Sequence, residues 1–202
     1  MPGDLIVVGA GGHAKVVVAT ARAAGFRVAA IVDDAHERWG TILLGVAVSG
    51  PSEPMLQDPA AQVVLAIGDN AARRRRAAGA RCCFASVVHP SAIIDPTVRL
   101  GAGSVVFAGA VIQPDTVLGP HAIVNTAASI DHDCVLGEAV HLAPGVRLAG
   151  NVTVGDEAFL GIGVVVIPGV SIGARTTVGA GAAVVHDLPA GVVAVGVPAR
   201  VR

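Results

Sequence analysis

Large aliphatic residues recur at every sixth position through the C-terminal half of the chain. Seventeen consecutive positions, taken in steps of six from Val88 to Val184, all carry Val, Ile or Leu. The residue two places before each of them is always Ser, Thr, Ala, Cys or Val. Because residues two apart on an extended strand point to the same side, each six-residue segment predicts a short strand with one large and one small residue facing inward.

Glycine marks a longer period in the same region. It recurs every eighteen residues, at Gly101, Gly119, Gly137, Gly155 and Gly173. Three six-residue strands per turn predict a triangular parallel β-helix of about five to six coils, stacked about 4.8 Å apart. We expect these glycines at the same corner of successive coils, where a tight turn favours a residue without a Cβ atom. A non-catalytic β-solenoid rod would show the same repeat.

The first 80 residues follow a different pattern, in which apolar runs alternate with helical stretches. The runs at 4–8, 27–32 and 63–67 predict strands, and residues 14–24 predict a helix. Such alternation indicates a small Rossmann-like α/β domain whose ligands bind at the carboxyl ends of its parallel strands. We therefore predict two domains, residues 1–80 and 81–202.

Three loops follow those strands, at residues 9–13, 33–34 and 68–70. The spacing Gly9-x-Gly11-x-x-Ala14, with Asp33 further on, is a nucleotide-binding signature, although a weak one. A glycine turn that leads into a helix suits a phosphate or another anion. The unit is short for a dinucleotide domain, so one nucleotide fits better. The arginines at 73–76 have no aromatic residues beside them, which favours the solvated face of a helix over a nucleic-acid site.

Composition excludes several classes of function. The 202-residue chain has a net charge of −1, which gives no reason to expect a nucleic-acid partner or an anionic membrane surface. No stretch of about 18 apolar residues is free of Gly, Pro and charge, and the opening residues do not resemble a signal peptide. The three cysteines form no CxxC pair. We expect a cytoplasmic protein.

Several short motifs, spread over the chain, point to one family. They are GAGGHA at 9–14, AIGDN at 66–70, SIDHDCVLGE at 129–138, His141, AGNV at 149–152, FLGI at 159–162 and GVPA at 196–199. In this order, with hexads between them, they resemble one branch of the hexapeptide-repeat acyltransferases. That branch contains the bacterial nucleotide-4-aminosugar N-acetyltransferases and the related sialic-acid O-acetyltransferases. The resemblance covers essentially the whole chain.

The resemblance implies a division of labour between the two domains. Residues 81–202 would form a left-handed parallel β-helix that binds acetyl-CoA as co-substrate and carries out catalysis without a metal. Residues 1–80 would bind the nucleotide sugar, and a homotrimer would place each active site between neighbouring subunits. The catalytic residues implied are His132 as general base, Asp133 beside it, and Gly150, whose amide would stabilise the oxyanion. Those implied for the coenzyme are His141, Ile162 and Ala180. Those implied for the nucleotide sugar are Gly11, Gly12, His13, Asp33, Asp34 and Gly68.

Two departures from the family pattern and several alternatives remain open at this point. Asp133 stands where the amino-sugar enzymes carry the longer Glu, so Asp131 is a second candidate partner of the imidazole. Ala180 replaces a glycine of the coenzyme groove. His141 can also act as the base, whereas we assign His121 to a solvated loop. O-acetylation of a sialic-acid-like sugar is the main alternative activity. A zinc-dependent, carbonic-anhydrase-like enzyme would need three clustered histidines, which the spread of His121, His132 and His141 disfavours.

Overall fold

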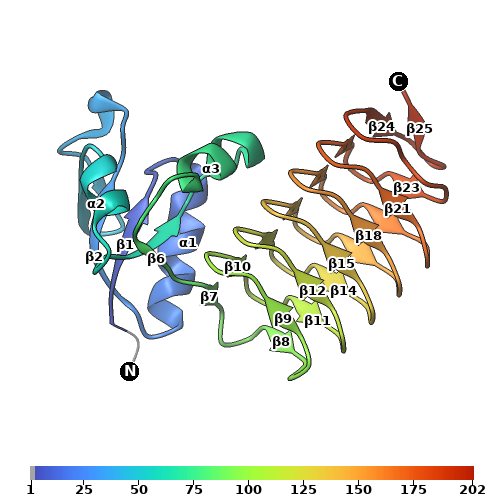
Figure 1. The fold of residues 1–202 in the computed structure, drawn as a ribbon, viewed down its shortest axis with the longest axis horizontal. Coiled ribbons are helices and arrows are strands. Elements are labelled where there is room, and N and C mark those ends of the chain that lie inside the picture. The colour runs from blue at the N-terminus through green and yellow to red at the C-terminus, as the bar shows by residue number, and fades with distance from the viewer. Residues whose placement is uncertain (1–2) are drawn as a thin grey trace.

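The computed structural model describes residues 3–202 as an α/β unit beside a β-solenoid (Figure 1). The solenoid extends away from the α/β unit, and the C-terminus lies at its far end. Helix α3 lies between the two units. In the described part of the chain, no helix combines the length and the hydrophobicity needed to cross a bilayer.

The α/β unit contains a six-stranded sheet with strand order β3-β4-β2-β1-β5-β6. Its strands are β1 (Asp4–Val8), β2 (Arg27–Val32), β3 (Ile42–Leu43), β4 (Val46–Ser49), β5 (Gln62–Leu65) and β6 (Cys83–Phe84). Its helices are α1 (Gly12–Ala23), the short 3-10 helix η1 (His36–Arg38), α2 (Glu53–Gln57) and α3 (Asn70–Ala77). All strand pairs are parallel except β3 with β4. The parallel Rossmann-like sheet is therefore confirmed, and its last strand lies just past residue 80.

The remainder of the chain forms a parallel β-helix with three flat faces. Face 1 contains β7 (Val87–Val88), β10 (Val105–Val106), β13 (Ile123–Val124), β16 (His141–Leu142), β19 (Phe159–Leu160), β22 (Thr177–Val178), β24 (Val193–Val195) and the antiparallel β25 (Arg200–Val201). Face 2 contains β8 (Ile93–Ile94), β11 (Val111–Ile112), β14 (Ser129–Ile130), β17 (Arg147–Leu148), β20 (Val165–Val166) and β23 (Ala183–Val184). Face 3 contains β9 (Arg99–Leu100), β12 (Val117–Leu118), β15 (Val135–Leu136), β18 (Thr153–Val154) and β21 (Ser171–Ile172).

The strands pair with partners eighteen residues away, as the repeat predicts. Ile112 lies beside Ile94 and Ile130 on face 2, for example. The large hexad residues and their small companions fill a single core inside the prism, including Ile130, Cys134 and Leu136, each at most 1% exposed. Burial of these repeated aliphatic side chains supplies the main driving force for the fold.

The glycines spaced by eighteen have a different role from the one we expected. None of them adopts the left-handed conformation; residues two places later at the same corner do, including Gly103, His121 and Glu157. A Cβ atom on Gly101 would lie 2.4 Å from the backbone of the next coil, and one on Gly119 would lie 2.6 Å away. Close stacking of the coils, rather than the conformation of the turn, therefore excludes a side chain at these positions.

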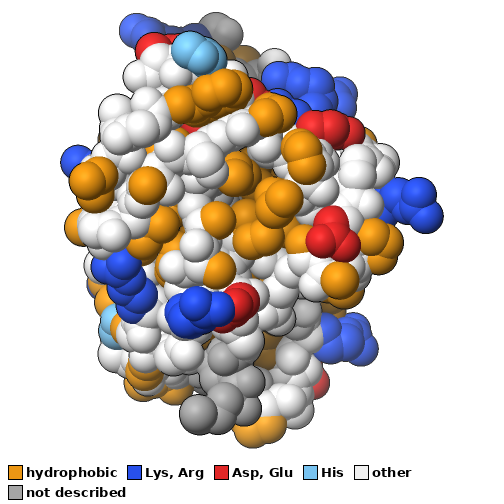
Figure 2. Space-filling model, turned by 90° about the vertical axis from the view of Figure 1, so that its left-hand side faces the viewer, with side chains coloured by type: hydrophobic (Ala, Val, Ile, Leu, Met, Phe, Trp, Pro, Cys, Tyr) orange, Lys and Arg blue, Asp and Glu red, His pale blue; other side chains and the backbone are white. Residues whose placement is uncertain are grey.

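The first coils of face 1 are covered by the α/β unit. The outward side chains of Val87, Val105 and Ile123, together with Phe107, pack into the same hydrophobic cluster as α1 and β1. On the opposite side of this unit, the surface seen in Figure 2 carries basic and acidic side chains scattered among hydrophobic ones, with no continuous basic patch in that view. The two units thus share a core, so the loops of one are held in fixed positions against the coils of the other.

Candidate functional site

The carboxyl ends of β1, β2 and β5 surround a pocket of 310 Å³. It is lined by Val8, Gly9, Gly11, Gly12, His13, Asp33, Asp34, Arg38, Ala66, Ile67, Gly68 and Arg76. Helix α1 begins at Gly12, directly after Gly11, so the free backbone N–H groups of its first turn can bind an anion here. Gly9 has a φ of +105°, and a Cβ atom there would lie 2.9 Å from the carbonyl oxygen of Ala66. All six residues predicted to hold the nucleotide sugar line this one pocket, which we call the nucleotide pocket.

Asp33 and Asp34 already have protein partners in this pocket. The Asp33 carboxylate accepts hydrogen bonds from the backbone N–H of Ala10 at 2.6 Å and from Arg38 at 2.8 Å. Asp34 accepts from the N–H and hydroxyl of Ser52 and pairs with Arg76. Burial alone would raise the pKa of Asp34, but these hydrogen bonds and the charge of Arg76 outweigh burial and lower it. The contacts of both carboxylates hold the loops of the pocket in place.

His13 and His141 bring the two units together at one end of the nucleotide pocket. Their ring centroids are 6.0 Å apart. His141 on β16 is 8% exposed; its Nδ1 lies 3.4 Å from the carbonyl oxygen of Gly68, and its Nε2 lies 3.3 Å from the amide of Asn125. The buried Nε2 of His13 meets no hydrogen-bond partner among residues 3–202.

We predicted that the arginines at 73–76 form the solvated face of a helix, and the structure corrects this prediction. Arg73 is 1% exposed. Its guanidinium donates to the backbone carbonyls of Ile67, Gly68, His121 and Ala139 and to the side chain of Asn70. Arg74 forms ion pairs with Glu138, Asp156 and Glu157 on the prism. Helix α3 is therefore bound to the β-helix, and Arg73 joins the loop of Gly68 to it.

His121 is also buried, contrary to our expectation of a solvated loop. It is 5% exposed and packs edge-on against Phe84 at a centroid distance of 4.5 Å. Burial, and then the positive charge of Arg73, lowers the pKa of His13, His121 and His141 to about 4. Burial also lowers the pKa of Arg73 to about 10, so Arg73 is still charged at neutral pH and the three histidines are neutral.

Stability should fall as the pH falls from about 6.5 towards 4. In this range the unfolded chain protonates these three histidines and the folded chain does not, so protons favour unfolding by at most about 1.4 kcal/mol per pH unit and histidine. Urea unfolding at pH 7.5 and 5.5 measures the effect. A His121→Gln variant, which removes one titrating group, should show a smaller difference between the two pH values. Equal stability of the wild type at both would contradict the burial of these rings in neutral form.

His132 lies at the corner between faces 2 and 3, and its side chain is 53% exposed. Its Nδ1 lies 2.7 Å from an oxygen of Asp133, so the shorter aspartate does reach the imidazole. Asp131 accepts instead from the backbone N–H of His132 at 2.9 Å. The hydrogen bond to Asp133, helped by the nearby carboxylate charges, raises the pKa of His132. With a carboxylate at Nδ1, the imidazole holds its proton there and keeps Nε2 as its acceptor atom.

Gly150 lies directly over the His132 ring. A Cβ atom at this position would be 2.6 Å from Cε1 of the ring, so only glycine permits this approach. The carbonyl of Gly150 accepts from the N–H of Gly169. Among residues 3–202, the N–H of Gly150 itself meets no protein acceptor. His132, Asp133 and Gly150 therefore form one cluster.

Ile162 and Ala180 form a third cluster, at the corner between faces 1 and 2. They occupy equivalent places on successive coils, and the N–H of Gly181 donates to the carbonyl of Ile162. Ile162 is 62% exposed. Residues predicted for the coenzyme thus lie at this corner, apart from His141, which faces the α/β unit.

A single chain does not bring all these clusters together. The nucleotide pocket lies on the side of face 1, whereas His132 occupies the prism corner opposite that face. Within residues 3–202, no group of three His, Cys, Asp or Glu side chains is placed to hold a metal ion. Sequence reasoning missed two residues of the site, Arg73 and Asn125. The run of arginines is evident in the sequence, but no neighbouring residue indicates that Arg73 is buried.

Family models match parts of both units of the chain. Two family models match, the PglD N-terminal domain over residues 4–79 and the bacterial transferase hexapeptide (six repeats) over residues 151–186. No curated protein sequence matches the chain.

Solved structures resemble the chain along its whole length. The perosamine N-acetyltransferase of Caulobacter crescentus, solved in complex with CoA and GDP-perosamine, is 48% identical, with a TM-score of 0.92 over 99% of this chain and 97% of that one. The acetyltransferase domain of PglB from Neisseria gonorrhoeae, solved with acetyl coenzyme A, is 37% identical, with a TM-score of 0.92 over 100% of both chains. WeeI from Acinetobacter baumannii is 29% identical, with a TM-score of 0.86 over 99% of this chain and 100% of that one.

Proposed function

Because this chain belongs to the PglD-like branch of the hexapeptide-repeat acyltransferases, we propose that it transfers the acetyl group of acetyl-CoA to the 4-amino group of a nucleotide-linked amino-deoxysugar. The observation that carries the proposal is the end-to-end similarity to a perosamine N-acetyltransferase. That protein's complex contains CoA and a GDP-linked sugar. A cytoplasmic location agrees with both substrates.

His132 is the general base in this proposal. Its Nδ1–H is held by Asp133, which leaves Nε2 to accept a proton from the amine as the amine attacks the thioester carbonyl. A C–N bond forms, the C–S bond breaks, and the proton passes to the leaving thiolate. The carboxylate raises the pKa of His132, whereas burial lowers that of His141 to about 4. His141 is thus the weaker base, and a positioning role next to the sugar suits it better.

The N–H of Gly150 is the donor proposed for the oxyanion. It belongs to the residue that packs on the His132 ring. The oxyanion that forms when an amine beside His132 attacks the thioester carbonyl of acetyl-CoA would therefore lie within reach of this N–H. One backbone donor of this kind is typically worth about 3 kcal/mol in the transition state. Ile162 and Ala180 would line the coenzyme groove through their backbone.

The separation of the clusters supports a homotrimer. A sugar held in the nucleotide pocket of one chain lies across the prism from the His132 of that chain. A neighbouring copy is therefore needed to bring His132 to the acceptor amine. Exposed aliphatic side chains on the outer prism surfaces, Ile93, Val135 and Val165, suit packing between copies.

A thiol-release assay tests the proposed reaction. Acetyl-CoA is offered with GDP-, UDP- and dTDP-linked 4-amino-6-deoxysugars and, separately, with free sialic acid. We expect CoA release with at least one amino sugar and none with sialic acid, and a product heavier by one acetyl group in mass spectrometry. If CoA were released with sialic acid but with none of the amino sugars, O-acetylation would replace N-acetylation as the proposed activity.

A further inference from the structure

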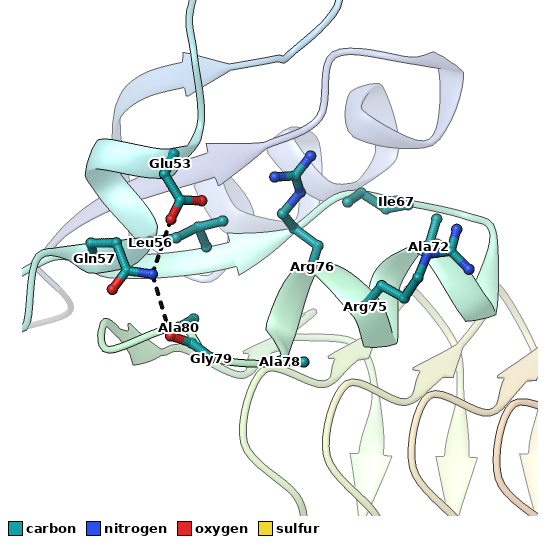
Figure 3. Close-up of a pocket in the computed structure, with 10 residues that line it drawn as sticks. All are labelled: Glu53, Leu56, Gln57, Ile67, Ala72, Arg75, Arg76, Ala78, Gly79 and Ala80. Atoms are coloured by element: carbon teal, nitrogen blue, oxygen red, sulfur yellow. Dashed lines mark hydrogen bonds between the residues drawn. The ribbon is translucent and has the colours of Figure 1, made fainter.

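Arg73 is directed differently from its neighbours on helix α3. Arg75 and Arg76 line a hollow between α2 and α3 (Figure 3). Arg73 is 1% exposed, and its Nη1 atom donates to the carbonyl of Ile67 at 2.8 Å and to that of Gly68 at 3.3 Å. Because Gly68 also lines the nucleotide pocket, Arg73 holds one wall of that pocket from behind.

The carbonyl of Gly68 is shared between Arg73 and His141. The Nδ1 atom of His141 lies 3.4 Å from this oxygen. A carbonyl oxygen only accepts hydrogen bonds, so the contact requires the proton of the imidazole to be on Nδ1. His141 is 8% exposed, so little water is present to replace this acceptor. Arg73 thus holds in place the group that the proton of His141 needs.

The other ring nitrogen of His141 indicates the same tautomer. Its Nε2 atom lies 3.3 Å from Nδ2 of Asn125. The Oδ1 atom of Asn125 accepts from the backbone N–H of Thr126 at 2.8 Å, so the amide nitrogen turned towards His141 is a donor. Nε2 therefore acts as an unprotonated acceptor. Two independent contacts place the proton of this ring on Nδ1.

The groups that face His141 also favour its neutral form. They are His13 of α1, whose ring centroid is 6.0 Å away, and the charged Arg73 of α3. On the prism side, the uncharged ring of Phe159 packs edge-on at 5.2 Å. Burial, then the charge of Arg73, then that of His13 lowers the pKa of His141 to about 4. The ring is therefore neutral at neutral pH.

We propose that Arg73 is a positioning residue of the acetyl-transfer site: through the carbonyl of Gly68, it fixes the proton of His141 on Nδ1 and the orientation of that ring beside the sugar. The inference rests on the proposed function for the identity of the substrate. While Asn125 donates to Nε2, the lone pair of this atom is occupied. His141 then cannot accept the proton of the amine, and this role is left to His132.

Nitrogen NMR of the whole protein, labelled with nitrogen-15 in its histidines, tests this arrangement without a substrate. The spectrum of His141→Asn identifies the signals of His141. In the wild type we expect the proton on Nδ1 and a neutral ring at both pH 7.5 and pH 5.5. In Arg73→Met, His141 should become a mixture of the two tautomers and be partly protonated at pH 5.5. The wild-type spectrum decides the tautomer even if this variant does not fold.

Kinetics with the best amino sugar distinguish positioning from a loss of folded protein. A smaller folded fraction lowers kcat and leaves both KM values unchanged. A displaced His141 should instead raise the KM for the amino sugar on the order of tenfold in Arg73→Met. The KM for acetyl-CoA should stay within about twofold of the wild-type value, because Arg73 acts on the wall of the nucleotide pocket.

Ile112→Ala is the matched control. Ile112 is 1% exposed in the prism core, so its truncation also destabilises the fold, but it should leave the His141 signals and both KM values unchanged. A wild-type proton on Nε2, unchanged His141 signals in Arg73→Met, or the same changes in Ile112→Ala would overturn the role of Arg73. Absence of turnover with every amino sugar would overturn the proposed function, whereas the spectra would still decide what Arg73 does to His141.

Discussion

Replacing His132 by asparagine should lower kcat by about 10² or more. Asparagine cannot accept the proton that the attacking amine loses, whereas the imidazole, held by Asp133 at 2.7 Å, can. The side chain is half exposed at a prism corner, so its loss should not disturb the core. Steady-state kinetics with acetyl-CoA and the best amino-sugar substrate measure the effect, and light scattering shows whether the oligomeric state is kept.

His186→Asn is the control for this variant. His186 is an exposed histidine near the C-terminal end of the prism, so the same substitution there should leave kcat within a factor of two or so of the wild type. Near-normal turnover by His132→Asn would contradict the role of general base. It would favour a mechanism in which the amine loses its proton to solvent before it binds.

Replacing Arg73 by methionine should lower the free energy of unfolding by about 3 kcal/mol or more. The change leaves buried carbonyls of both units without their donor, and each such loss typically costs about 1–3 kcal/mol. The acceptors are the carbonyls of Ile67, Gly68, His121 and Ala139 and the side chain of Asn70. Urea unfolding followed by circular dichroism measures the change.

Arg75→Met is the control for Arg73 and lies on the same helix. Arg75 is exposed, so its replacement should change the stability by less than about 0.5 kcal/mol. Arg73→Lys should be intermediate, because one ammonium group cannot satisfy five acceptors in different directions. Equal stabilities of Arg73→Met and Arg75→Met would show that the hydrogen bonds of Arg73 between the two units contribute nothing to the free energy of unfolding.

The β-helix could be predicted from the sequence because every coil imposes the same packing constraint. Each coil repeats the same large aliphatic and smaller inward positions, so the pattern from Val88 to Val184 specifies strand, face and register together. The motif predicts His132 and Asp133 as site residues, and the structure shows that their side chains are in contact. Their contact through Nδ1, with Asp131 bonded to the backbone instead, depends on corner geometry that the repeat does not encode.

The role of Arg73 could not be predicted, because its partners are mostly backbone carbonyls. A carbonyl is present at every residue and leaves no signal in the sequence, so four adjacent arginines look equally solvated. The same applies to His121, whose burial depends on Phe84 in a distant part of the chain. For Asp33 and Asp34 the sequence indicated that both would lie at the ends of the strands, where they line one pocket, but the folded loops determine their protein partners.

The attachment of α3 has a consequence for how the molecule opens. In a solenoid, each coil contacts only its neighbours, so unfolding can spread from either end one coil at a time. Helix α3, however, bonds to residues on three successive coils, since Arg73 reaches His121 and Ala139 while Asn70 reaches Glu157. We expect these coils to open together with the α/β unit as one cooperative block, so that amide hydrogen exchange starts in the coils at the C-terminal end of the prism.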